Sequence, residues 1–282
     1  MHQEHPRGRR REERSALEGT EPRRRNMWSS TGPNVSTQGQ NESSFDFKTF
    51  SNLSTLRKDV QQHLVAVYSL LAASLLSASV GVYAHLTVQL GGFLTTVANI
   101  VCVVWLLSMY NLPDNFRQRL SLFLGASFFQ GCTIGLLVEH VLVFHPSVLL
   151  TAFLGTSAIF ACFTASALVS PRRSYLYLGG FLGSALSTMA MLRLGSMFLG
   201  GYNQMFQVEL YLGLLVMAGY VLFDTQLIVE KATYGVKDPL VDSLKLYSDF
   251  VSMFVRLLII LSRNSETRGR DKGNRRNARQ AN

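Results

Sequence analysis

Apolar and polar residues are sharply separated along this chain. Long apolar runs, joined by short polar connections, follow one another from Leu64 to Leu261, and both ends of the chain are polar. A helix needs about 20 apolar residues to cross about 30 Å of hydrocarbon. The runs are continuous, unlike the alternating pattern of barrel strands. The pattern predicts an all-α membrane protein with helical segments at 64–86, 91–110, 120–144, 148–169, 175–199, 210–229 and, more weakly, 250–261.

The seventh segment is short and contains Arg256, so the sequence does not decide whether it crosses the membrane. We expect a bundle of six to seven transmembrane helices in which the last segment is either packed centrally or re-entrant. A re-entrant segment would return the basic residues after Leu261 to the side that it entered from, as their charge favours.

Lys and Arg fall on alternate connections, and this sets the predicted orientation. The connections at 85–90, 139–147 and 200–209 contain neither residue. Short loops rich in Lys and Arg face the cytosol, so we expect a cytosolic N-terminus, with the first apolar run acting as a signal anchor. The basic residues behind this prediction are Arg57, Lys58, Arg117, Arg119, Arg172, Arg173, Lys231, Lys237 and Lys245.

Composition divides the chain into three parts. Charged residues are only 16% and hydrophobic residues 48% of the sequence, and the net charge is +9. These values exclude a disordered protein and an ordinary soluble enzyme, and three cysteines exclude a disulfide scaffold. We predict a disordered polar tail at 1–54, a multi-pass helical domain at 55–262 and a basic disordered tail at 263–282. The first tail contains sequons at Asn34, Asn41 and Asn52, which stay unglycosylated in the cytosol, and Met27 is an alternative start.

Small residues at helical spacing mark candidate contacts between helices. Gly131 and Gly135, and likewise Gly179 and Gly183, form GxxxG patterns, which allow helix backbones to approach closely. Such patterns also arise by chance.

Ionisable residues inside apolar segments are the main candidates for function, because charge is costly in lipid. Asp224 lies six residues before Glu230, and Asp249 lies four residues after Lys245. At 1.5 Å per residue, both carboxylates lie one to two turns inside the same face of the membrane. Weaker candidates are Arg193, Arg256, Glu139 and Glu209, and His140 with His145 does not make a credible metal pair.

Two carboxylates that meet in a medium of low dielectric cannot both stay ionised, so they share a proton. Asp224 and Asp249 could therefore act as a pH-dependent latch, and carboxylate oxygens also suit Ca²⁺. The alternative is that each aspartate only hydrogen-bonds a helix end. This applies best to Asp249, since the helix dipole favours an anion at a helix start.

Three motifs in order carry a resemblance to a known family. They are the run from Pro146 (PSVLLTAFLGTSAIF), the run from Arg172 (RRSYLYLGG) and the run from Val221 (VLFDTQLIVEKA), and the similarity continues through Leu246 (LYSDFV). From about residue 45 to 261 the chain resembles the Bax inhibitor-1 family. This resemblance implies a multi-pass protein of the endoplasmic reticulum that suppresses apoptosis and lowers stored Ca²⁺ through a pH-sensitive leak.

The resemblance also implies roles for particular residues. Asp224 and Asp249 match the paired aspartates that form the family's pH-sensing latch, and Arg119 is the candidate latch partner. Implied partners are the lipid bilayer, Ca²⁺ as permeant ion, Bcl-2 family proteins and calmodulin, with no nucleic acid and no cofactor. Retention in the endoplasmic reticulum depends on the resemblance alone, because the chain has no dilysine ending.

Two other function classes remain open. The first is an interaction scaffold without ion flux, whose helices bind membrane proteins and whose basic tail binds acidic lipids or calmodulin. The second is an intramembrane aspartyl protease, which needs one carboxyl as acid and one as base. The Gly-x-Gly-Asp and Pro-Ala-Leu motifs of presenilin-like proteases are absent from the sequence.

Overall fold

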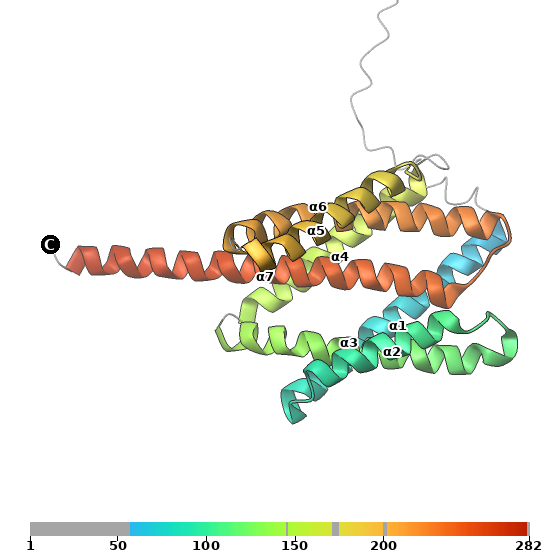
Figure 1. Cartoon of the computed structure of the whole chain (residues 1–282), viewed down its shortest axis with the longest axis horizontal. Helices are drawn as coiled ribbons and strands as arrows, with labels where there is room; N and C mark the ends of the chain where they lie inside the picture. Colours follow the sequence, from blue (N-terminus) through green and yellow to red (C-terminus); the bar gives the residue numbers. More distant parts are fainter. Residues whose placement is uncertain (1–56, 145, 171–174, 200–201, 281–282) are drawn as a thin grey trace, which may run out of the picture. The chain divides into compact units, whose positions relative to one another are not determined.

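The computed structural model describes residues 57–144, 146–170, 175–199 and 202–280. Within these ranges the chain forms helices and no strand (Figure 1). The predictions for the N-terminal tail, its sequons and Met27, and those for Arg172, Arg173 and His145, fall outside the described residues. The helices are α1 (Lys58–Val88), α2 (Phe93–Ser108), the 3₁₀ turn η2 (Pro113–Asn115), α3 (Phe116–Phe144), α4 (Pro146–Val169), α5 (Leu178–Leu199), α6 (Tyr202–Thr233) and α7 (Pro239–Gln280).

Every apolar segment predicted from the sequence forms a helix, so the predicted all-α class is confirmed. Within the described residues, α1, α3, α4 and the part of α6 from Phe206 to Thr233 are long and apolar enough to cross a membrane, and α2 is a shorter apolar helix. Large apolar side chains such as Leu76, Phe93 and Leu94 point outward. A soluble protein rarely exposes so much contiguous apolar surface, whereas lipid covers it in a membrane protein.

The first GxxxG pattern is a close contact between α1 and α3. A Cβ atom added at Gly131 would collide with the backbone of Ala78, and one added at Gly81 would collide with the backbone of Phe128. A Cβ at Gly135 would lie 2.6 Å from the Cβ of His85. Only glycine lets these two helices approach so closely.

The second pattern is a contact at only one of its two residues. A Cβ at Gly179 would lie 2.6 Å from the ring of Phe223 on α6, whereas Gly183 faces open space.

The last helix is packed centrally. α7 contacts α1, α3, α4 and α6 (Figure 1). Its buried side chains, including Leu246, Phe250, Met253 and Leu258, belong to the main hydrophobic core. Burial on several sides explains why this segment needs no long apolar run of its own.

Two expectations for the end of the chain differ from the structure. α7 is one unbroken helix from Pro239 to Gln280, so the described residues contain no turn of the kind that a re-entrant segment needs. The predicted disordered tail is also helical over residues 263–280. No proline follows Pro239 to stop the helix, and Gly269 and Gly273 oppose it by only about 1 kcal/mol each.

Candidate functional site

The carboxyl groups of Asp224 on α6 and Asp249 on α7 meet inside the bundle. Both residues are buried, and their carboxyl groups interact electrostatically with each other. Two ionised carboxylates would repel each other in a buried site, which favours a proton on one of the two groups. Among the described residues, Oδ2 of Asp249 is buried without a conventional donor. The arrangement is therefore a buried pair of carboxyl groups between two helices.

Two lysines and a third aspartate surround this pair. Lys245, one turn before Asp249, interacts electrostatically with both carboxyl groups, while Lys231 and Asp242 interact with Asp224. With one shared proton the pair carries a single negative charge. Together with Asp242 it then balances the charges of Lys231 and Lys245. Such balance is needed because an uncompensated charge in a buried site is strongly destabilising.

Arg119 has a different partner from the one expected. Its side chain is 1% exposed, and its Nη1 donates to Oδ1 of Asn111 at 2.8 Å. Its Nη2 donates to Oδ2 of Asp238 at 2.6 Å. Arg119 lies in the first turn of α3, level with the connection between α6 and α7, whereas Asp224 lies nine residues before the end of α6. The arginine thus anchors that connection, and its ion pair is with Asp238, not with Asp224 or Asp249.

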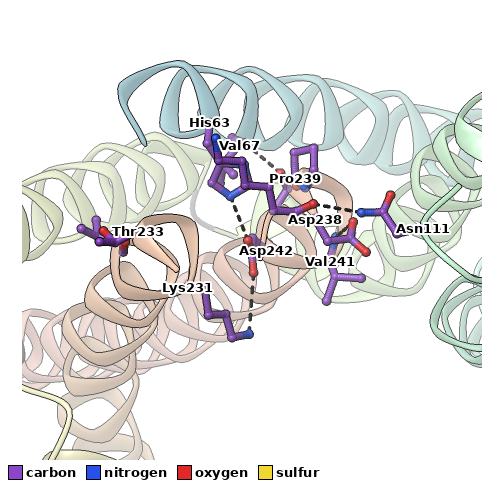
Figure 2. A network of polar contacts seen from close by, with 12 residues as sticks. His63, Val67, Asn111, Lys231, Thr233, Asp238, Pro239, Val241 and Asp242 are labelled. Carbon is purple, nitrogen blue, oxygen red and sulfur yellow. Dashed lines mark hydrogen bonds and ion pairs between the residues drawn. The ribbon is translucent and has the colours of Figure 1, made fainter. Parts of the chain in front are cut away.

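A second buried acidic group, missed by the sequence reasoning, lies in the first turn of α7 (Figure 2). Nε2 of His63 on α1 lies 3.0 Å from Oδ2 of Asp242 on α7, and Nζ of Lys231 on α6 lies 4.0 Å from Oδ1 of the same carboxylate. His63 is 6% and Asp242 is 2% exposed. Asp242 precedes Asp249 by seven residues, which places both on one face of α7. That spacing is the sequence signal that could have identified Asp242.

The amide of Gln226, two residues after Asp224, fixes the neighbouring helices. Its Oε1 accepts from the backbone N–H of Tyr175 at 2.8 Å, and its Nε2 donates to the carbonyl of Ala167 at 3.3 Å. The motif around Asp224 therefore joins α6 to the end of α4 and to the connection that follows it.

The weaker charged candidates lie toward the other ends of the helices. Glu139 accepts from Nε2 of His85 at 3.2 Å and from Nε2 of Gln89 at 3.0 Å. Nη1 of Arg193 donates to Glu209 at 3.3 Å. Arg256 donates to the carbonyl of Ser252 at 3.1 Å.

The ring of His140 lies against Phe144. No group of three metal-binding side chains occurs in the part of the chain that the structure describes.

Known proteins are similar to this chain over most of its length. The family model "Inhibitor of apoptosis-promoting Bax1" matches residues 60–266. Bax inhibitor 1 of Arabidopsis thaliana is 41% identical over 234 residues, which are 83% of this chain and 94% of that protein. Bax inhibitor 1 of Mus musculus is 40% identical and that of Homo sapiens 39% identical, each over 229 residues, 80% of this chain and 96% of the relative.

These relatives exclude one of the function classes that the sequence left open. The family consists of membrane proteins without enzymatic activity, so the alternative of an intramembrane aspartyl protease is wrong. With seven α-helices in the described residues, a family match over residues 60–266 and this level of identity, the chain belongs to the Bax inhibitor 1 family of multi-pass membrane proteins.

Proposed function

We propose that this protein suppresses apoptosis from the membrane of the endoplasmic reticulum as a pH-sensitive Ca²⁺ leak that the carboxyl pair gates. The observation that carries the proposal is the burial of Asp224 and Asp249 beside each other, where two ionised carboxylates would repel, so that a shared proton is favoured. Release of that proton places two negative charges together in a buried site. Their repulsion favours separation of α7 from α6.

Ca²⁺ is the permeant ion in this proposal, and no resident cofactor takes part. Carboxylate oxygens are the ligands that Ca²⁺ prefers, so the ionised pair would attract the ion that it admits. Lys231 and Lys245 take the place that Arg119 was expected to have. Both interact electrostatically with Asp224, whereas Arg119 is held by Asn111 and Asp238.

The test is Ca²⁺ flux through the purified full-length protein in liposomes, measured between about pH 5 and 8. We expect the parent rate to depend on pH and the rate of Asp224→Asn and of Asp249→Asn to be flat, because an amide cannot release a proton. Asp59→Asn is the matched control, since Asp59 is an exposed aspartate in the first turn of α1. Unchanged pH profiles in both variants would refute the gate.

An interaction scaffold without ion flux is the outcome to separate from a leak. If the parent protein passes no Ca²⁺ but co-isolates Bcl-2 family proteins or calmodulin from membranes, the scaffold explains protection from cell death. We also propose that the N-terminus faces the cytosol. Glycan on Asn34, Asn41 or Asn52 in expressed protein would contradict that orientation.

A further inference from the structure

The contact between His63 and Asp242 joins helices that are far apart in the sequence. The two residues are 179 positions apart, and their side chains are each 3% exposed. His63 continues the buried stripe of α1, which also includes Val60, Leu64 and Val67. Asp242 lies in the first turn of α7. The pair therefore holds the start of α7 against α1 at the level where α7 enters the bundle (Figure 2).

The carboxylate of Asp242 is shared between two helices. Its Oδ2 accepts from Nε2 of His63, and its Oδ1 faces Nζ of Lys231 at 4.0 Å. α1, α6 and α7 thus converge on one carboxylate. Neither oxygen bonds to the backbone in the contacts described here, so the strength of the junction depends on the charge of its two partners.

The charges around this junction come from each neighbouring element. α6 contributes Lys231 and Asp224, and α7 contributes Lys245, which contacts Lys231. α3 contributes Arg119, whose charge is paired with Asp238 in the connection between α6 and α7. α4, which contacts both α6 and α7, contains no Asp, Glu, Lys, Arg or His from Pro146 to Val169. Among these groups His63 is the imidazole, a side chain that can contact Asp242 as a neutral or as a charged donor.

We propose that His63 and Asp242 form a second proton-sensitive contact, which fastens α7 to α1 when His63 is protonated and loosens when it is neutral. A neutral imidazole gives Asp242 one ordinary hydrogen bond. A protonated imidazole gives a charge-assisted bond of roughly twice that strength. This proposal rests on the proposed function only where it concerns Ca²⁺ flux. The expected movement of α7 against α1 does not depend on any flux.

A neighbouring contact provides a matched control. Oγ of Ser243 lies 2.9 Å from the backbone carbonyl of Val67 and so also joins α7 to α1, although the carbonyl of Pro239 competes for its one proton. Neither group changes charge with pH. Loss of the Ser243 bond should loosen the contact between α7 and α1 equally at all pH values. Loss of the charge on His63 should instead remove the dependence of that contact on pH.

The test measures the separation of α1 and the start of α7 in full-length protein in lipid nanodiscs at pH 5 and pH 8. Cys102, Cys132 and Cys162 are replaced by alanine. Spin labels are placed by Gln62→Cys and Val236→Cys, since both positions are exposed. Electron–electron double resonance then reports the distribution of distances between the labels. We expect a narrow distribution at pH 5 and a broader one at pH 8.

Three variants decide the proposal. His63→Gln keeps a donor for Asp242 but cannot be protonated, and we expect its distribution to be the same at both pH values. Ser243→Ala should give a broader distribution that still responds to pH. Asp224→Asn should also retain the response, which separates this contact from the carboxyl pair.

A pH response in His63→Gln equal to that of the parent would overturn the proposal, as would the absence of any response in the parent. Loss of the response in Asp224→Asn together with its retention in His63→Gln would assign the movement to the carboxyl pair instead. Failure of the Ca²⁺ leak in liposomes changes none of these distances, so the two proposals can fail separately.

Discussion

The two ends of α1 each carry a buried histidine that contacts a carboxylate of another helix, yet the two contacts are built differently. His63 lies near the start of α1 and His85 near its end, 22 residues or about 33 Å further along. Nε2 of His63 faces the buried Asp242 at 3.0 Å. Nε2 of His85 faces Glu139 at 3.2 Å, and the side chain of Glu139 is 39% exposed.

The second ring nitrogen makes the difference. Nδ1 of His85 accepts the backbone N–H of Gly91 at 2.7 Å, which places the ring proton of a neutral imidazole on Nε2. His85 therefore fixes the connection after α1 through a backbone donor that does not change charge. Among the residues that the structure describes, the polar partner of His63 is a side chain of α7, Asp242. The same residue type serves as a fixed clamp at one end of α1 and as a contact of variable strength at the other.

The largest effect is expected at the end of the bundle that contains Arg119 and the carboxyl pair. It tests how far the stability of that end depends on buried charges. Arg119→Met should lower the free energy of unfolding by about 3 kcal/mol, because it removes one partner of a largely buried ion pair and leaves Asp238 uncompensated. Thermal unfolding of the purified protein in detergent measures this loss. Arg117→Met is the control, since Arg117 is exposed two residues earlier in the same turn. Equal stability of the two variants would show that Asp238 is satisfied by solvent.

A smaller effect is expected at the opposite end. His85→Ala should destabilise the protein by about 2 kcal/mol, because it leaves the N–H of Gly91 without its acceptor. Glu139→Gln should cost less, since its side chain is partly exposed and the amide oxygen can still accept from His85. The same unfolding measurement compares them. If Glu139→Gln lowered the free energy of unfolding more than His85→Ala, the carboxylate of Glu139, and not the backbone N–H of Gly91, would be the main source of stability at this contact.

The smallest effect concerns the ion pair between Arg193 and Glu209. The side chain of Arg193 is 58% exposed, so solvent screens its charge. Arg193→Met should change the free energy of unfolding by no more than about 0.5 kcal/mol. A loss close to that of Arg119→Met would remove the contrast between a buried arginine at one end and an exposed one at the other.

Helix positions could be predicted from the sequence because continuous apolar runs have one stable form in lipid. The pairing of Asp224 with Asp249 was also accessible, since each could be placed at the same depth by counting residues from charged helix ends. The depth of a residue in the membrane does not say in which direction its side chain points around the helix axis. For that reason Arg119, at a similar level, was assigned to the wrong partner.

His63 and Asp242 were missed for a related reason. Each lies at the edge of an apolar run, where a polar residue is normally solvated, and only the packing of α1 against α7 buries them together. The helical extension of α7 after Leu261 was missed because composition alone favours a disordered tail, whereas helix continuity depends on the absence of a stop signal.

The 16 residues of α2 make it about 24 Å long, less than the hydrocarbon thickness of an average bilayer, which is about 30 Å. Lipid beside α2 must thin to match it, and the energy of that deformation increases with every ångström of mismatch. A helix of this length that crosses a bilayer therefore deforms a thin membrane less than a thick one.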